Sequence, residues 1–286
     1  MQDLSEEYYL TLCSKVYSLK DIQKLRIAIG NRIEAFKNKE VYRQKRGLPP
    51  IKLQPEEKEV FETIVRKLSE NYEGLEGKEK TLKQEIAELA MQHPLWKEWL
   101  KNIKGLGAYS AGVLIAELWL RTFKYRSSLK RYCGLGTTQD GKAQNKVNSK
   151  NLKDHKYNHF LQSFLLGVVA DNFIKQKTPV YYEYYLKKKE EAAQKHPEYV
   201  PPPGGWNSVP KDKRHPGRLD KIARREMMIL FINHLWEVMH KMKTGKLAPP
   251  PQHFKNTPIK PEEYIPPPFY PEPTVSWNIR NYEDIQ

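Results

Sequence analysis

The stretch Ile103-Lys104-Gly105-Leu106-Gly107-Ala108-Tyr109-Ser110-Ala111-Gly112-Val113-Leu114-Ile115-Ala116 decides the fold of the central part of the chain. It contains two glycines separated by one apolar residue, and small residues and an apolar helix follow. This is the pattern of a helix-hairpin-helix motif. Glycine allows a positive φ, and such a turn leaves backbone N–H groups uncovered at the start of the second helix. The alternative is a tight helix–helix corner in which glycine serves close packing.

Uncovered amides at a helix N-terminus form, together with the helix dipole, a site for phosphate. We therefore expect Gly105 and Gly107 to present backbone donors to a sugar–phosphate chain, a contact that holds a nucleic acid without reading its bases. Lys101 and Lys104 lie just upstream and are expected to make a second phosphate contact.

The positive charge of the chain is concentrated around this motif. Of a formal net charge of +15, residues 101–160 carry +9, from 12 basic and 3 acidic residues, and residues 211–246 carry +6. Charge concentrated in this way predicts a surface that attracts a polyanion, and tyrosines among the basic residues suit phosphates and exposed bases. The alternative is a solvated, lysine-rich surface.

The candidate nucleic-acid-binding residues are the two glycines of the turn, one tyrosine and the basic residues of the two charged blocks. They are Lys101, Lys104, Gly105, Gly107, Tyr109, Arg121, Lys124, Arg126, Lys130, Arg131, Lys142, Lys146, Lys150, Arg218, Arg224 and Arg225. DNA is the expected partner, with RNA left open.

Residues 1–94 are predicted to form a helical hairpin or a coiled-coil arm. Apolar residues recur at helical spacing, and glutamate and lysine alternate on the other faces. We expect two of its helices at 55–68 and 78–91, joined by a turn at Gly74 and Gly77. A plain helical bundle is the alternative. An arm of this kind predicts a homodimer.

The remainder is expected to be mainly α-helical as well. Residues 95–246 are predicted to form the helix-hairpin-helix domain, with a Pro/Gly-rich loop at 197–217 and a last long helix at 218–243. The tail, 247–286, holds 10 of the 21 prolines, and we expect an extended arm whose aromatic residues dock on the domain.

The order of several short motifs is more specific than any one of them. After the hairpin come Phe123, Tyr132-Cys133-Gly134-Leu135-Gly136, Gly141-Lys142, Asn148-Ser149-Lys150, a helix at 160–170, and a last helix with Ala223-Arg224-Arg225 and His234-Leu235-Trp236. This order resembles the C-terminal transposase domain of the IS-one-ten family of insertion-sequence transposases and pilin-gene invertases. The stretch Asp21 to Arg32 is similar to the start of the family's coiled-coil arm. The resemblance implies DNA binding and dimerisation through the arm.

Two departures argue against catalysis by this chain. The family places a RuvC-like nuclease domain with four acidic residues before the arm, whereas 20 residues precede the arm here. The family's nucleophilic serine corresponds to Asp140, and a carboxylate would repel a scissile phosphate. The weak catalytic candidates are Ser149, Thr137 and Thr138. The expected function is therefore DNA binding without independent catalysis. The alternatives are a transposase or recombinase subunit that uses a nuclease partner or a guide RNA, and a structural interaction module.

Composition excludes several other classes of protein. Two cysteines, Cys13 and Cys133, exclude a disulfide scaffold, and no apolar run approaches the roughly 18 residues that span a bilayer. The first residues lack the basic and apolar regions of a secretory signal. His155 and His159 lack a third ligand at a diagnostic spacing, so we expect no metal and no cofactor. A cytoplasmic, membrane-independent protein is the expectation.

Overall fold

The computed structural model describes residues 4–47, 49, 54–137, 143, 157–251 and 260–277. The expected mainly α-helical class is confirmed: helices form the described part of the chain, and its only β-type pairing consists of isolated bridges. None of the helices in these ranges combines the length and the apolar character that crossing a bilayer requires.

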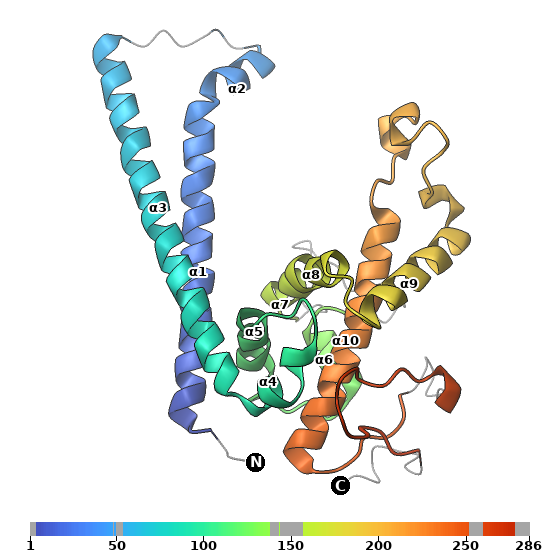
Figure 1. The fold of residues 1–286 in the computed structure, drawn as a ribbon. Coiled ribbons are helices and arrows are strands. Elements are labelled where there is room, and N and C mark those ends of the chain that lie inside the picture. The colour runs from blue at the N-terminus through green and yellow to red at the C-terminus, as the bar shows by residue number, and fades with distance from the viewer. Residues whose placement is uncertain are drawn as a thin grey trace.

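The N-terminal part is a long projecting arm made of α1 (Glu6–Lys37), the short α2 (Lys39–Lys45) and α3 (Pro55–Gln92), with α1 and α3 packed along each other (Figure 1). The prediction of a turn at Gly74 and Gly77 is wrong, because α3 runs through both glycines without a break. A glycine inside a helix costs about 1 kcal/mol relative to alanine, and the packing of α3 on its neighbours offsets this cost. The hairpin therefore exists, but α1 and α3 form it.

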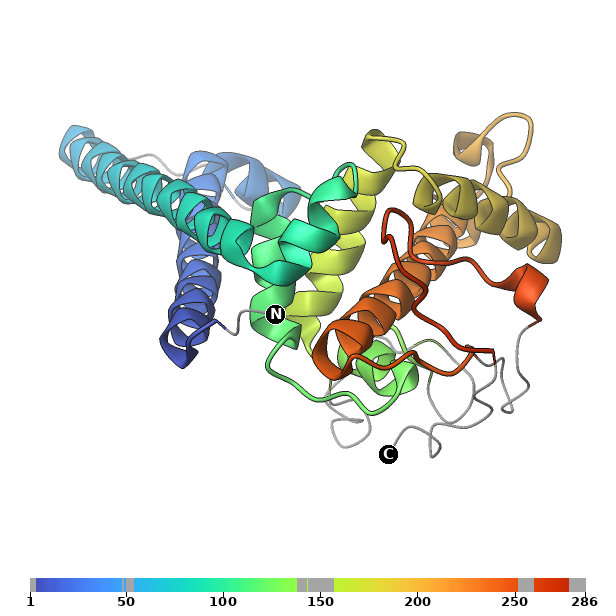
Figure 2. The same cartoon turned by 60° about the horizontal axis from the view of Figure 1, so that its bottom comes forward.

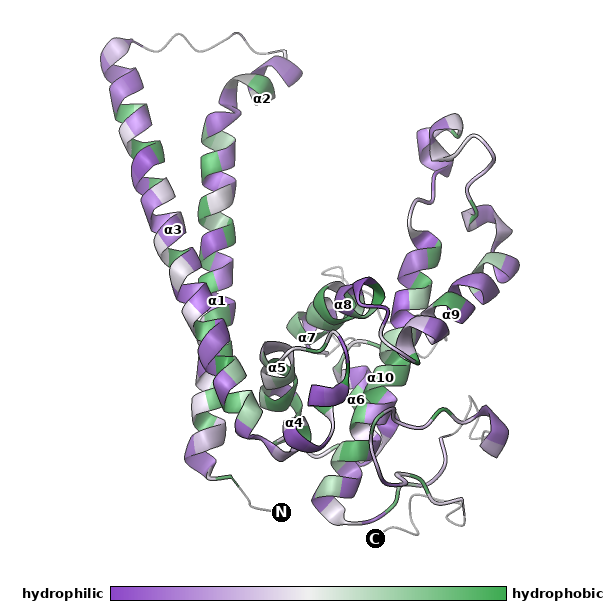
Figure 3. Ribbon diagram, viewed as in Figure 1, coloured by the Kyte–Doolittle hydropathy of each residue, from purple (hydrophilic) through white to green (hydrophobic). Residues whose placement is uncertain are grey.

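The centre of the molecule is built around α5 (Ala108–Leu118), which is buried along almost its whole length. α4 (Pro94–Glu98) and a 3-10 turn (Leu100–Asn102) lead into it, and α6 (Arg126–Tyr132) follows. Gly112 lets α5 approach α3 closely, since a Cβ there would lie 2.5 Å from Ile86 Cγ2. Figure 3 shows the hydrophobic residues gathered in this centre, whereas the outer parts of the arm are mostly hydrophilic.

A continuous helical rod packs beside α5 in the opposite chain direction. It consists of α7 (His159–Phe164), a π-helical turn (Leu165–Val169) and α8 (Ala170–Lys175). Asn158, at the start of the rod, contacts Glu117 near the end of α5, and Asn172, near the end of the rod, lies against Gly105 just before α5. The start of the rod thus lies beside the end of α5, and the end of the rod lies beside the start of α5. The polar features of the domain lie at these two places.

A second helical hairpin, α9 (Tyr181–Lys195) with α10 (Arg218–Thr244), projects on the same side as the arm (Figure 1). The expected loop at 197–217 joins its helices and contains three short 3-10 turns, Pro197–Tyr199, Trp206–Ser208 and Lys211–Lys213. The last helix agrees with the expected 218–243, and it ends at Gly245 in the left-handed region (φ 69°).

The proline-rich tail is extended where it is described, apart from a 3-10 turn at Pro261–Glu263, and it docks on α10 and its neighbours (Figure 2). Glu237 of α10 is buried and accepts hydrogen bonds from the hydroxyls of Tyr264 (2.7 Å) and Thr274 (3.0 Å). The indole of Trp99 donates to the carbonyl of Pro268 (2.8 Å). Buried polar anchors of this kind explain how a segment without regular secondary structure holds one path.

Candidate nucleic-acid interface

The two glycines of the helix-hairpin-helix turn, Gly105 and Gly107, have different structural roles. Gly105 has φ +85°, and a Cβ there would lie 3.1 Å from the carbonyl oxygen of Asn172. The hydroxyl of Thr178 donates to the carbonyl of Lys104 (2.7 Å), which fastens the loop after α8 onto the turn. Gly105 therefore serves close packing, the alternative that the sequence left open. Its N–H donates to no backbone acceptor among the described residues, and its expected contact with phosphate stays a prediction.

Gly107 faces solvent instead. It is the N-cap of α5, it is exposed, and nothing lies within 4 Å of the position that its Cβ would take. Within the described residues, the N–H groups of Ala108, Tyr109 and Ser110 donate to no protein acceptor. Such free first-turn amides carry the positive end of the helix dipole.

Exposed lysines surround this end of the helix. Lys101 and Lys104 precede the turn, and Lys177 lies on the loop that Thr178 fastens to it. We call Lys101, Lys104, Gly107, the first turn of α5 and Lys177 the hairpin corner. In the described structure none of these lysines lies within 4.0 Å of a carboxylate, so their charges remain available to an anion.

Tyr109 was expected to contact nucleic acid, but its ring turns toward the protein. The ring packs edge-on against Phe164, with the centroids 6.0 Å apart, and Lys83 lies over it. Burial, with a smaller contribution from Glu79, raises the pKa of its hydroxyl to about 12. The side chain of Tyr109 thus belongs to the contact between α5, α7 and α3 rather than to the hairpin corner.

The cluster between residues 121 and 131 divides into inward and outward cations. Arg126 was expected on the surface, and this expectation is wrong: its side chain is buried, pairs with Glu237 (3.0 Å) and donates to the carbonyl of Pro249 (2.8 Å). Burial, together with repulsion from Arg126, lowers the pKa of Lys130, which is half-buried. Arg121, Lys124 and Arg131 are exposed, as expected.

The three candidate binding arginines of α10 have different surroundings. Arg218 is exposed beside the ring of Tyr199, but Arg224 forms ion pairs with Asp220 (2.7 Å) and Asp171 (3.4 Å). Arg225 donates to the carbonyls of Gly134 and Gly136, and burial lowers its pKa. The last two arginines fasten helices and a loop together, so they are corrected from binding residues to structural ones.

Several candidates lie outside the described residues, namely Thr138, Lys142, Lys146, Ser149 and Lys150. Thr137 is exposed and forms an isolated bridge with Ala143. In the described ranges no three His, Cys, Asp or Glu side chains come together as a metal site would require.

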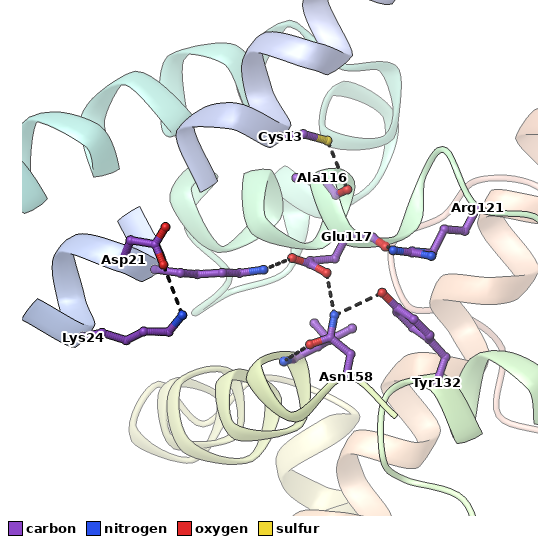
Figure 4. A network of polar contacts seen from close by, with 10 residues as sticks. Cys13, Asp21, Lys24, Ala116, Glu117, Arg121, Tyr132 and Asn158 are labelled. Atoms are coloured by element: carbon purple, nitrogen blue, oxygen red, sulfur yellow. Dashed lines mark hydrogen bonds and ion pairs between the residues drawn. The ribbon is translucent and has the colours of Figure 1, made fainter. Parts of the chain in front are cut away.

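At the opposite end of α5 the structure reveals a polar network that the sequence did not predict (Figure 4). Glu117 is 3 % exposed, and its carboxylate accepts from the ammonium of Lys20 and from the side-chain amide of Asn158 (2.6 Å). The same amide donates to the hydroxyl of Tyr132 (3.1 Å). A glutamate at the end of an otherwise apolar helix was the one available signal, because its partners are remote in sequence.

Side chains close this end of α5. The thiol of Cys13 donates to the carbonyl of Ala116 (3.4 Å), and Arg121 Nε donates to that of Glu117 (3.0 Å). Lys243 donates to the carbonyls of Trp119 and Arg121. Cations at a helix C-terminus also interact favourably with the helix dipole.

The chain was compared with protein-family models, with curated proteins and with solved structures, and it matches none of them.

Proposed function

We propose that this protein binds nucleic acid, with DNA as the expected partner, by holding the phosphate backbone at the hairpin corner. The observation that carries the proposal is the open N-terminus of α5: three amides without a protein acceptor, a glycine N-cap with free space above it, and lysines without acidic partners beside it. Amides and lysines grouped in this way bind phosphate groups of any sequence.

The motif order adds a relationship to this proposal. The hairpin, Tyr132 to Gly136 and the arginine-bearing last helix follow one another as in IS-one-ten transposases, and we extend the proposal to a transposase-derived protein without independent catalysis. Both cysteines are free, which agrees with a reducing compartment such as the cytoplasm.

The arm supports a further part of the proposal, a homodimer. Residues 24–46 carry a net charge of +6 and residues 55–77 carry −4, so the two sides of the arm have opposite charge. Large apolar side chains are exposed on both of its long helices: Leu25 and Ile27 on α1, Val60 and Ile64 on α3. An antiparallel meeting of two arms would cover these side chains and pair opposite charges. The double variant Val60→Glu/Ile64→Glu should convert the dimer into a monomer, as measured by light scattering.

The test of the hairpin corner uses a change that keeps the helix but blocks the amides. Aspartate is a favourable N-cap residue, and its carboxylate accepts from the amides that phosphate would use. We therefore expect Gly107→Asp to fold with unchanged or slightly higher stability and to bind labelled duplex DNA about tenfold more weakly, a loss of about 1.4 kcal/mol. Binding is measured by fluorescence anisotropy in a salt titration.

Gly107→Ala is the matched control, because its methyl group fits the open space and leaves the amides free. This variant should bind nearly as the wild type does. Equal affinity of the aspartate and alanine variants would remove the hairpin corner from the interface. A wild-type affinity that does not change with salt would remove phosphate binding altogether.

A further inference from the structure

Beside the network around Glu117, Arg121 is held in place without an acidic partner among the described residues. Arg121 is exposed, and no carboxylate of the described residues lies within 4.0 Å of its guanidinium. Both oxygens of the nearest network carboxylate, that of Glu117, are occupied by Lys20 and by Asn158. The charge of Arg121 is therefore not neutralised within this network.

Three contacts fix the orientation of this guanidinium. Its Nε donates to the carbonyl of Glu117 (3.0 Å), and its carbon atom lies 4.7 Å from the centre of the Tyr132 ring. The third contact is a hydrogen bond from Arg121 to the hydroxyl of Tyr17. Burial raises the pKa of this hydroxyl, whereas the charge of Arg121 and this hydrogen bond act to lower it. An arginine stacked on an aromatic ring presents its remaining N–H groups in a fixed direction.

The two rings that hold this guanidinium, those of Tyr17 and Tyr132, each carry a hydroxyl. Tyr132 accepts a hydrogen bond from the amide of Asn158, so its own proton remains available for donation. Tyr17 is 51 % exposed. Lys243, which donates to the carbonyl of Arg121 (3.2 Å), adds a second positive charge at this end of the helix. A planar cation with neighbouring hydroxyl donors matches the oxygens of a phosphoryl group.

We propose that Arg121, Tyr17 and Tyr132 form a subsite for one phosphodiester group, which we call the arginine subsite, and that Glu117 positions it. Glu117 binds Lys20 of the arm and Asn158 at the start of α7, and Asn158 in turn binds Tyr132. One carboxylate therefore links the segments that carry Tyr17, Arg121 and Tyr132 (Figure 4). The proposal rests on the proposed function, because it takes nucleic acid as the source of the phosphodiester.

The arginine subsite is separate from the hairpin corner. The two lie at opposite ends of α5, about 15 Å apart for ten residues at 1.5 Å each. A strand of nucleic acid covers that distance in about four nucleotides at 3.4 Å per charge. The two sites are therefore expected to contribute separately to affinity and to its salt dependence.

The experiment compares the wild type with Arg121→Gln, Arg121→Lys and the double variant Tyr17→Phe/Tyr132→Phe in salt titrations of DNA binding. Removing one phosphate contact should lower the slope of log K against log[salt] by about 0.9 and weaken binding severalfold. Arg121→Lys should keep the slope and lose part of the affinity, because an ammonium replaces the planar fork. The tyrosine variant should lose affinity about threefold with an unchanged slope, since only neutral donors are removed.

Arg66→Gln serves as the control, because Arg66 lies on α3 in the arm and, among the described residues, its ion-pair partner is the exposed Glu70. Arg121 also caps α5. If capping were its only role, Arg121→Gln would have a lower melting temperature than the wild type but the same slope of log K against log[salt]. That result would overturn the arginine subsite and leave the hairpin corner standing. Absence of any DNA binding by the wild type would instead overturn the proposed function and, with it, the subsite.

Discussion

The two ends of α5 treat their backbone groups in opposite ways. At the C-terminal end, Cys13, Arg121 and Lys243 donate to carbonyls that the helix leaves unpaired. At the N-terminal end, the first-turn amides meet no acceptor in the described part of the chain, and the N-cap has no side chain. One helix thus ends in a closed, internally satisfied network and begins at an open edge.

On the proposed function, this difference separates an end needed for stability from an end that would meet nucleic acid. Buried polar groups without partners cost free energy, whereas exposed amides are satisfied by water until a ligand replaces it. Changes at the closed end should therefore act on stability first, and changes at the open end on binding.

The largest effect is expected from breaking the ion pair at the closed end. Lys20 and Glu117 have side chains that are 12 % and 3 % exposed, so Glu117→Ala leaves a mostly buried ammonium without its partner. We expect a loss of about 3–5 kcal/mol in the free energy of unfolding, measured by denaturant titration. Glu85→Ala is the control, because its pair with Lys15 is about one-third exposed and should contribute less than about 1 kcal/mol. Similar losses in both variants would contradict the contrast.

The second effect is a dependence of stability on pH at the same end. His93 is buried against Trp119, and burial, then Lys243 and Lys97, lowers its pKa to about 4. Above its ordinary pKa of about 6.5 the ring is neutral in both states. As the pH falls from about 6.5 toward 4, only the unfolded chain takes up the proton, so stability decreases. Between pH 7 and pH 5 this should amount to about 2 kcal/mol.

The variant His93→Asn isolates this contribution. Asparagine can still accept from the N–H of Leu95, as Nδ1 of His93 does (3.1 Å), but it does not titrate. Buried His234 and half-buried His240 also have lowered pKa values and remain in both proteins. The wild type should therefore lose about 2 kcal/mol more than the variant between the two pH values; equal losses would show that His93 has no part in the effect.

A smaller effect separates the two glycines of the turn. Gly105→Ala places a side chain at φ +85° and 3.1 Å from the backbone of α8, and should lower stability by about 1–2 kcal/mol. Gly107→Ala, in extended backbone with free space, should cost less than about 1 kcal/mol. Thermal unfolding followed by circular dichroism compares them, and the reverse order would contradict the assignment of Gly105 to packing and Gly107 to the surface.

The smallest effect concerns the lysines at the open end. Lys101→Gln and Lys104→Gln should each lower the slope of log K against log[salt] by about 0.9, with a loss of affinity of a few-fold and no change in stability. Lys80→Gln, exposed on α3, should leave the slope unchanged. Slopes equal to that of the wild type in all three variants would place the bound phosphates elsewhere.

How far the sequence predicts the molecule depends on the range of the interactions involved. The last helix and its glycine terminator follow from local patterns, and the structure agrees with them. The turn at Gly74 and Gly77 does not form, because contacts along the whole of α3 outweigh a local cost of about 1 kcal/mol for each glycine. The number of basic residues can be read from the sequence, but the sequence does not show which of them face the core. Arg126 turns inward to Glu237, 111 residues away.

By itself the sequence determined the helical class, the position of the glycine turn and the concentration of positive charge, because helical periodicity, glycine and net charge are properties of neighbouring residues. Only the tertiary structure decided which glycine is packed and which is open, which arginines are buried, and that Lys20, Glu117, Tyr132 and Asn158 meet at one point. These outcomes depend on contacts between segments far apart in the chain, and no local pattern specifies which of many similar residues a packed core encloses.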